Sequence, residues 1–292
     1  MRAVEFFSGI GGWRYALGKR GTILRAYDIS PAANDTYAHN HGSRPWDREI
    51  ASLDPLQLEG LQADTWFMSP PCQPFCRMGN QRGLEDLRSR AFLHLMALLE
   101  RVPPQHLVLE NVSGFLGSDA YGLLRERLSQ AGLACQEYHL CPTQFGIPNL
   151  RPRFFLVASR SPLATPVAPW PMEPRRLGSY LDPEEEATLY LSPGERAKHE
   201  PGLALATADS VDSACFIGGY GKRFVGSGAF LRTPEGIRRF SPREIARLLG
   251  LPQDFQFPGH ISRLKQYKLL GNGLSIPVAQ WVLDALTPRP PC

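Results

Sequence analysis

The sequence predicts a doubly wound α/β fold, in which helices cover both faces of a central sheet. Over residues 1–160, short apolar runs alternate with segments of helical spacing. A glycine turn, Gly9 to Gly12, directly follows the first apolar run. The chain has 292 residues, of which 43% are hydrophobic, enough for a sizeable core. We therefore expect one large α/β domain with a smaller one beside it.

The expected elements follow from these patterns in chain order. Strands are predicted at Ala3–Phe7, Ile23–Asp28, Thr65–Met68, His106–Leu109, Leu133–Leu140 and Phe154–Ala158. Helices are predicted at Trp13–Lys19, Pro31–His39, Arg88–Arg101, Ala120–Ala131, Pro242–Leu249 and Pro277–Leu286. A proline suits the first turn of a helix, as at Pro31, and Gly132 suits the position after a helix end.

Residues 161–269 differ in composition from the rest. Prolines interrupt the start of this region, and a glycine-rich stretch runs from Gly218 to Gly228. We expect a small, irregular domain over 161–269, and a larger domain made of 1–160 and 270–292.

Composition narrows the class of protein. No apolar run is long enough to span a membrane, and the N-terminal segment is too short and too acidic for a signal peptide. Six cysteines are too few for a disulfide framework, so we expect reduced thiols and a cytoplasmic protein. The net charge of +4 is compatible with a polyanionic partner but does not establish one.

Candidate site residues gather at the expected strand ends, where open α/β sheets bind ligands. The turn from Ser8 to Gly12 follows the first strand, Asp28 ends the second, and Cys72 and Glu110 follow two later strands. The turn and an acid that could bind ribose hydroxyls together suggest a nucleoside cofactor without a phosphate chain. A plain structural turn and a helix cap at Asp28 remain alternatives.

Cys72 lies in Ser69-Pro70-Pro71-Cys72-Gln73-Pro74-Phe75, where three prolines restrict the backbone around one thiol. This framing suits a nucleophile, although a buried packing cysteine remains open. Cys76 lies four residues on, but no CxxC pair or histidine cluster is near, so no metal site is expected.

Three further charged residues are candidates for the same site. Glu110 directly follows an apolar strand, and its alternative is a capping or solvent-facing acid. Arg151 and Arg153 have the alternate spacing that places two side chains on one face of a strand. Such a pair could bind phosphate or an anionic ring oxygen, and its alternative is surface solubility.

These segments resemble the cytosine-C5 methyltransferase family. The PPCQPF run around Cys72 is similar to the nucleophile motif, Glu110-Asn111-Val112 to the second catalytic motif and Phe7–Gly12 to the cofactor turn. Arg151-Pro152-Arg153 resembles the paired-arginine motif, and residues 271–277 resemble the C-terminal motif. The motifs occur in the family's order over nearly the whole chain. The resemblance implies a mixed sheet of the class I S-adenosylmethionine-dependent methyltransferase type.

Within the family, the chain resembles the compact branch that methylates the tRNA anticodon loop. Asn149 precedes the paired arginines, Cys215-Phe216 is followed by two glycine runs, and no long target-recognition domain is present. Ile217 and Cys76 stand where that branch usually has threonine, and neither change removes a catalytic group.

The resemblance implies S-adenosylmethionine as cofactor and assigns roles to the two domains. The larger domain would carry catalysis and cofactor binding, and the domain at 161–269 would recognise the target. The cofactor-binding residues carried over by motif are Phe7, Gly9, Gly11, Asp28, Ile29, Glu49, Ile50, Pro71, Asn272 and Leu274. No clean strand precedes Glu49 and Ile50, which makes those two the least supported.

The implied mechanism is a covalent one. The Cys72 thiolate adds to C6 of cytosine, so that C5 becomes nucleophilic and accepts the methyl group. Glu110 would donate a proton to N3 and accept from the exocyclic amine. Arg153 would contact the base oxygen O2, and Arg151 would support Cys72 or a phosphate. The base that removes the C5 proton is not identified.

The target base must leave its stack to be methylated, so binding residues should be basic and partly aromatic. We expect substrate contacts from Lys222, Arg223, Arg232 and Arg239, within a basic cluster that also includes Arg238, Arg243, Arg263, Lys265 and Lys268. Each could also be a solvated surface charge. The expected substrate is tRNA, with DNA as the alternative, and the expected protein is a monomer that binds neither metal nor membrane.

Two other classes of protein share part of these features. A nucleotide-binding oxidoreductase would share the α/β frame, but it should carry GxGxxG and has no need of PPCQP. A non-catalytic RNA-binding module would keep the basic cluster but could lose Cys72 or Glu110, and both are present. The residues therefore favour an enzyme.

Overall fold

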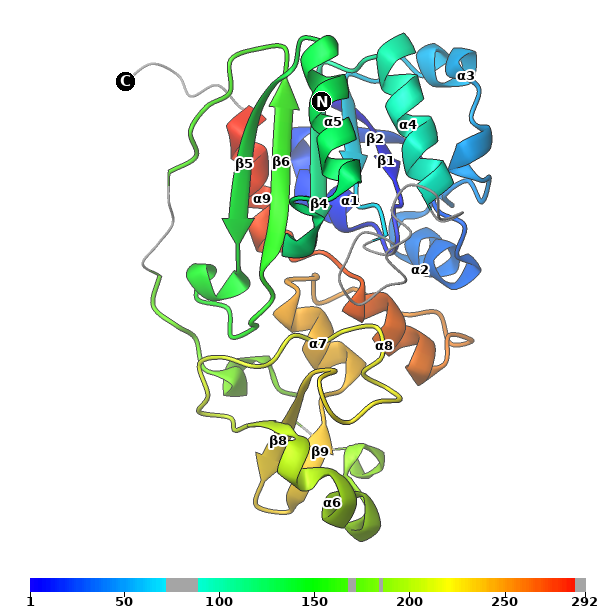
Figure 1. Ribbon diagram of the computed structural model, residues 1–292. Coiled ribbons are helices and arrows are strands. Elements are labelled where there is room, and N and C mark those ends of the chain that lie inside the picture. The colour runs from blue at the N-terminus through cyan, green and yellow to red at the C-terminus, as the bar shows by residue number, and fades with distance from the viewer. Residues whose placement is uncertain (72–88, 168–171, 184–185, 287–292) are drawn as a thin grey trace. The chain divides into compact units, whose positions relative to one another are not determined.

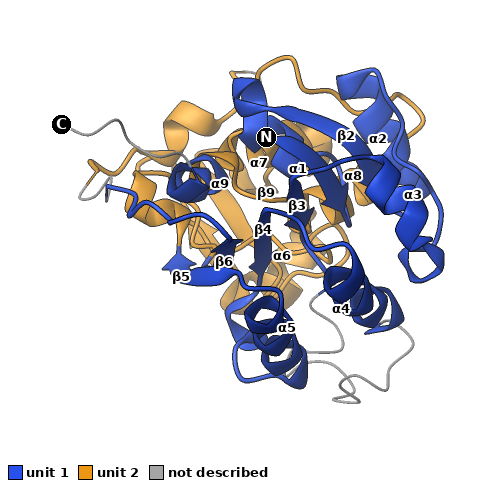
Figure 2. Cartoon of the chain, turned by 90° about the horizontal axis from the view of Figure 1, so that it is seen from above, with its two compact units in different colours: residues 1–140, 152–167, 279–292 blue, residues 141–151, 168–278 orange. Residues whose placement is uncertain are grey.

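The computed structural model describes residues 1–71, 89–167, 172–183 and 186–286. The chain divides into two compact units (Figure 2). Unit 1 comprises residues 1–140, 152–167 and 279–292, and unit 2 comprises residues 141–151 and 168–278. The division differs from the domain boundaries expected from sequence, because residues 141–151 and 270–278 group with unit 2 and residues 161–167 group with unit 1.

Six strands of the described residues form one mixed sheet in unit 1 (Figure 1). They are β1 (Arg2–Phe6), β2 (Thr22–Tyr27), β3 (Thr65–Met68), β4 (His106–Asn111), β5 (Ala134–Leu140) and β6 (Arg153–Ser159). The order is β2-β1-β3-β4-β6-β5, and β6 runs antiparallel to both of its neighbours. The carboxyl ends of β1 to β4 therefore lie along one edge of the sheet, where the candidate residues were expected.

Helices pack on both faces of this sheet, as a doubly wound fold requires (Figures 1 and 2). The helices of unit 1 are α1 (Gly12–Leu17), α2 (Pro31–His41), α3 (Pro55–Gly60), α4 (Arg90–Arg101), α5 (Asp119–Gln130) and the greater part of α9 (Ile276–Leu283). Alternate residues of a strand face opposite sides, so Val4 and Phe6 join the core under α3, α4 and α5. On the other face, Trp13 of α1 stacks on Phe67 with ring centroids 5.1 Å apart.

The predicted strands and helices of unit 1 are confirmed to within two residues at most ends. The largest difference is the end of α9, which stops at Leu283 instead of Leu286 and continues as a single 3-10 turn, Asp284–Leu286. Helix α3 was not predicted, because it is only 6 residues long. It begins with Asp54, whose side chain accepts from the backbone N–H of Leu56, and with Pro55.

Unit 2 contains short regular elements, of which only α7 was predicted from sequence. Its strands are β7 (Ala204–Ala206), β8 (Ala229–Thr233) and β9 (Gly236–Arg239), and its helices are α6 (Pro193–His199), α7 (Pro242–Leu248) and α8 (Arg263–Gly271). Aromatic rings fill its interior, with Tyr220 and Phe240 buried. The Tyr220 hydroxyl donates to the carbonyl of Ala229 and accepts from the N–H of Phe240, at 2.7 and 2.9 Å.

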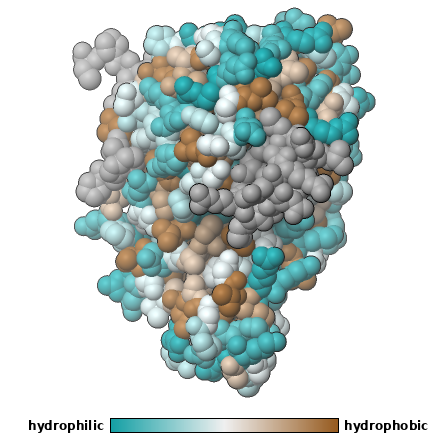
Figure 3. Space-filling view, viewed as in Figure 1, coloured by the Kyte–Doolittle hydropathy of each residue, from teal (hydrophilic) through white to brown (hydrophobic). Residues whose placement is uncertain are grey.

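Two observations concern hydrophobicity, one on the surface of unit 2 and one along the helices. The region of α6 is mainly hydrophilic, as the lower part of the space-filling view shows (Figure 3). Among the helices formed by the described residues, none has the length and hydrophobicity that a membrane crossing needs.

Candidate active site

The turn after β1 is held by Asp28 at the end of β2. The two oxygens of the Asp28 carboxylate accept from the backbone N–H groups of Gly9 and Ser30, each at 2.8 Å. Burial raises the pKa of Asp28, and these two hydrogen bonds oppose the shift. The helix cap of α2 is Ser30, not Asp28, so the alternative of a cap at Asp28 is wrong.

The backbone of this turn takes an unusual path. Phe7, Gly9 and Gly11 all have positive φ, at 56°, 53° and 87°. A side chain at Gly11 would also collide with His41, since an added Cβ would lie 2.4 Å from its Nε2. Only glycine fits at Gly11, and the non-glycine Phe7 is held in a conformation that functional turns often require.

A buried acid lies in the middle of β1, on the face that α1 and α2 cover. Glu5 is completely buried. Its carboxyl accepts from the backbone N–H of Trp13 at 3.1 Å and from the Tyr37 hydroxyl at 3.2 Å. Burial raises the pKa of Glu5 to about 8, although both hydrogen bonds act against the shift. The sequence interpretation missed this residue; an acid inside an apolar strand was the available signal.

At the end of β4, Glu110 forms an ion pair with Arg153 at the start of β6. The distance from Arg153 Nε to a Glu110 carboxylate oxygen is 3.2 Å. The side chains are 12% and 16% exposed, so the pair is accessible but largely desolvated. The structure therefore brings together two of the residues predicted to contact the base.

The next residue of β4 fastens the segment that leads to Cys72. Asn111 is buried, its amide donates to the carbonyl of Pro70 at 3.1 Å, and its oxygen accepts from the Val112 N–H at 2.9 Å. Cys72 and Cys76 themselves lie outside the described residues. Asn111 belongs to a motif that the sequence indicated, but its own role was not predicted.

Arg151 is buried in unit 2, where its side chain forms hydrogen bonds with backbone carbonyls of other residues. Its guanidinium donates to the carbonyls of Phe216, Gly271 and Gly273, at 3.0, 3.0 and 2.6 Å. Arg153 pairs instead with Glu110, so the two arginines do not form one fork on a shared partner among the residues described. Support of Cys72 or of a phosphate by Arg151 stays a prediction.

The other residues expected to bind a cofactor have varied surroundings. Ile29, directly after Asp28, is 69% exposed, an unusual position for a large apolar side chain. Ile50 is buried in the core of unit 1, so only its backbone is available to a ligand. Glu49 and Pro71 are exposed in unit 1, whereas in unit 2 Asn272 is exposed and Leu274 is buried.

The residues expected to bind substrate are all in unit 2. Lys222 and Arg223 are exposed. Arg232 is exposed as well, but it forms an ion pair with Glu200 at 3.0 Å. The Arg239 guanidinium lies 4.6 Å from the ring centroid of Phe224 and donates to backbone carbonyls, so much of its binding capacity is used within the protein.

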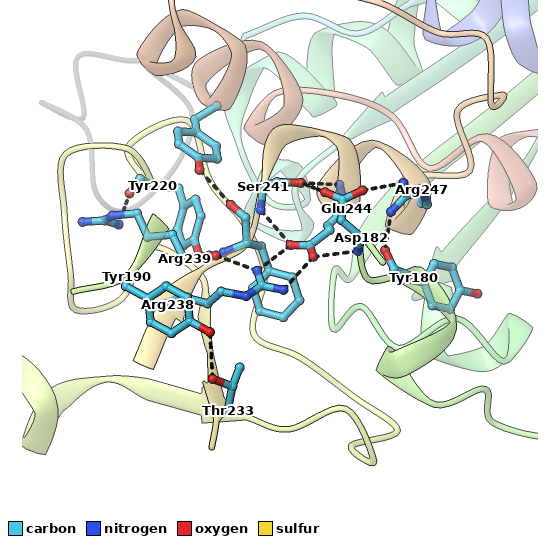
Figure 4. Close-up of polar contacts among 12 residues, drawn as sticks. Tyr180, Asp182, Tyr190, Tyr220, Thr233, Arg238, Arg239, Ser241, Glu244 and Arg247 are labelled. Carbon is cyan, nitrogen blue, oxygen red and sulfur yellow. Dashed lines mark hydrogen bonds and ion pairs between the residues drawn. The ribbon is translucent and has the colours of Figure 1, made fainter. Parts of the chain in front are cut away.

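One member of the predicted basic cluster is a structural residue. Arg238 is 1% exposed and forms two hydrogen bonds, of 2.9 and 2.8 Å, with the carboxylate of Glu244 (Figure 4). Glu244 also accepts from the N–H groups of Ser241 and Asp182, which ties α7 to the segment before it. The prediction that Arg238 contacts nucleic acid is therefore wrong, because its side chain is inaccessible.

The described part of the chain contains no cluster of three or more His, Cys, Asp or Glu side chains placed to hold a metal ion.

The chain matches the family described as C-5 cytosine-specific DNA methylase over residues 1–189 and 194–287. It belongs to this family. The match covers far more than half of the chain and includes every strand and helix named above, except Pro193 at the start of α6. The chain is accordingly a cytosine-C5 methyltransferase, as the motifs predicted, and the predicted class I methyltransferase fold is confirmed.

The relatives of this chain include enzymes named for methylation of tRNA and enzymes named for methylation of DNA. The chain is 31% identical to a tRNA (cytosine(38)-C(5))-methyltransferase of Schizosaccharomyces pombe, over 98% of this chain and 96% of the relative. It is 29% identical to a DNA (cytosine-5)-methyltransferase of Dictyostelium discoideum, over 98% and 94% of the two chains. The crystal structure of the S. pombe Dnmt2 methyltransferase superposes with a TM-score of 0.90 at 30% identity, covering 98% of both chains.

Proposed function

We propose that this methyltransferase acts on cytosine in a tRNA anticodon loop, through a covalent adduct of Cys72 and with S-adenosylmethionine as methyl donor. The observation that carries the proposal is the Glu110–Arg153 pair at 3.2 Å, next to the Asn111 bond that fastens the segment before Cys72. These contacts support the proposal, because they place an acid and a guanidinium together on two strands of one unit.

The residues around the first turn fit the proposed cofactor. A carboxylate has about four lone-pair sites, and Asp28 uses two of them for Gly9 and Ser30, so two remain for ribose hydroxyls. The exposed side chain of Ile29 offers an apolar surface to an adenine ring. The buried hydroxyl of Ser8, which has no hydrogen-bond partner among the described residues, offers a further polar contact. When bound, S-adenosylmethionine supplies the electrophilic methyl group.

The Glu110–Arg153 pair matches one edge of cytosine. That edge presents O2, N3 and the exocyclic amine in a row. A guanidinium can donate to O2, while the neighbouring carboxyl can share a proton with N3 and accept from the amine. Partial burial strengthens these contacts, because water competes less for them.

The chain's own residues then perform the following steps. The Cys72 thiolate forms a bond to C6, and the electron pair of the C5–C6 double bond moves into the ring, where a proton from Glu110 at N3 balances the charge. This makes C5 the nucleophile that accepts the methyl group. A base then removes the C5 proton, the electron pair of that C–H bond re-forms the C5–C6 double bond, and the C6–S bond breaks to release the Cys72 thiolate. Glu110 takes back the N3 proton.

A loop of RNA is the favoured substrate for a physical reason. The target base must leave its stack, and a loop base is already partly unstacked, so flipping it costs less than the few kcal/mol that a paired base requires. The described elements of unit 2 are short, and a major groove is usually read by a longer helix or ribbon. The relatives named for tRNA methylation point the same way.

The deciding experiment is a methylation assay with labelled S-adenosylmethionine. The kcat/KM values for tRNA, for unmodified duplex DNA and for hemimethylated duplex DNA are compared at one salt concentration. We expect a higher value for tRNA, with product formation lost in Cys72→Ala. A higher value for either DNA would refute the RNA assignment and leave the assignment of Cys72 intact.

A further inference from the structure

The outer edge of the large sheet carries arginines that the proposed chemistry does not use. Strand β2 forms this edge (Figure 1), and a cavity of about 100 Å³ opens beside it in unit 1. Arg14 of α1, Arg25 of β2 and Arg44 after α2 all line the cavity, together with Ser43. Three guanidinium groups from separate elements thus border one small space, which we name the arginine cavity.

Positive charge at this edge is only partly neutralised. Arg44 forms an ion pair with Asp35. Arg25 and Arg48 both lie against the ring of Trp46, with guanidinium carbons 3.8 and 5.3 Å from its centroid, and neither forms an ion pair with a described residue. The Nε atom of Arg25 is buried without a hydrogen-bond partner among those residues. Two cations on one ring repel each other, and an anion would relieve that repulsion.

Arg14 is positioned by neutral groups. It donates to the Ser43 hydroxyl at 2.7 Å and to the carbonyl of His41 at 3.2 Å. The acid that interacts with it is Glu5, whose pKa is raised by burial to about 8, so this carboxyl is mostly protonated at neutral pH. The positive charge of Arg14 is therefore largely uncompensated.

The volume of the arginine cavity limits the size of the group that can bind there. A water molecule occupies about 30 Å³ in the liquid, so the arginine cavity holds roughly three waters or one phosphate group. A second cavity of about 370 Å³ shares Arg14 and Ile23 with the first and is lined by Tyr15, Thr22 and His41 among others. A group joined to the phosphate, such as a nucleoside, has room there.

We propose that the arginine cavity binds a phosphodiester group of the RNA substrate, at the β2 edge of unit 1 and apart from the strand ends that carry the site. Planar guanidinium groups donate two parallel hydrogen bonds to phosphate, and contacts of this kind position a nucleic acid without reading its sequence. The inference rests on the proposed function, since it requires a nucleic-acid substrate. It adds a contact outside the region where the sequence predicted substrate binding.

The experiment measures tRNA binding by the full-length protein over a series of salt concentrations. Arg25→Gln removes one guanidinium that has no ion-pair partner among the described residues. It is expected to weaken binding about 5- to 10-fold and to lower the slope of log K against log salt by roughly 0.7 to 0.9, the value for one phosphate contact. Arg25→Lys should recover the salt slope but not the full affinity for tRNA. Lysine restores the positive charge, but it lacks the planar guanidinium that donates two parallel hydrogen bonds.

Arg101→Gln is the matched control, because it removes an exposed arginine of α4 that has no partner in the described residues. It should leave affinity and slope unchanged, and kcat at saturating tRNA should be equal in all variants. Equal binding by wild type and Arg25→Gln would overturn the inference while tRNA methylation by the wild type still supports the proposed function. Stabilisation of the wild type by inorganic phosphate, with tRNA binding unchanged in Arg25→Gln, would overturn it too, since the cavity would then hold a free anion.

Discussion

Glu5 provides a quantitative test of the structure beneath the cofactor turn. An unfolded glutamate has a pKa of 4.5, whereas burial raises the pKa of Glu5 in the folded protein to about 8. Between these values the unfolded state loses a proton that the folded state keeps. The free energy of unfolding therefore falls as pH rises from about 4.5 to 8, and this contribution is fully present below 4.5. A shift of 3.5 units corresponds to about 5 kcal/mol as an upper scale.

Glu5→Gln removes this titration with little change of shape. A glutamine oxygen can still accept from the Trp13 N–H, and its amide can meet the Tyr37 hydroxyl. We expect the variant to gain stability relative to wild type steadily between pH 5 and pH 8, by several kcal/mol in all. Urea unfolding at a series of pH values gives the difference directly.

The comparison with wild type matters because a neighbouring group titrates in the opposite sense. Burial lowers the pKa of His41 from 6.5 to about 4, so its contribution to stability is lost as pH falls from 6.5 to 4. This slope is common to both proteins and cancels in the difference. Glu59→Gln, at an exposed position of α3, is the matched control. A parallel pH profile for Glu5→Gln and wild type would show that Glu5 is ionised in the folded protein and would refute the reasoning.

Three further predictions concern catalysis. Cys72→Ala should abolish methyl transfer, while cofactor binding, measured by calorimetry, survives. Cys76→Ala is the control and should keep most of the methyltransferase activity. An inactive Cys76→Ala protein would mean that the nucleophile is assigned to the wrong thiol. Glu110→Gln should lower the single-turnover rate about 100-fold or more, because an amide cannot share a proton with N3, and an unchanged rate would exclude that role. Asn111→Asp keeps the acceptor but loses the donor to Pro70, so kcat should fall about 10- to 100-fold with cofactor affinity unchanged, and equal losses of both would indicate general destabilisation.

The fold was predictable where local pattern and long-range packing agree. Most strands of unit 1 are short apolar runs, because both faces of the sheet are covered there, whereas the edge strand β5 is largely polar. Caps such as Ser30-Pro31 mark helix starts. Helix α8 was not predicted, because it is short and its apolar residues Leu264, Tyr267 and Leu270 alternate with three basic ones. Only tertiary contacts, such as the hydrogen bond from Tyr267 to the carbonyl of Phe240, reveal why it is ordered.

The candidate site also combines features that the sequence predicts with features that depend on tertiary structure. Motifs identified Glu110 and Arg153, but their pairing depends on the antiparallel register of β4 and β6, which no local pattern encodes. Charge clusters were a poorer guide. Arg238 and Lys222 look alike in the sequence, yet one is buried against Glu244 and the other is exposed, because burial of a charge depends on a partner distant along the chain or around a turn.

The register of β4 explains why two consecutive residues can serve the two halves of the proposed chemistry. Strand β3 ends at Met68, which pairs with Leu109, so β4 extends two residues past it. In that extension, Glu110 and Asn111 pair only with β6, and their side chains point to opposite faces. One side chain therefore reaches Arg153, while the other binds the carbonyl of Pro70. A one-residue slip of β4 would exchange the two faces, removing the Glu110–Arg153 pair and the Asn111 hydrogen bond to Pro70 together.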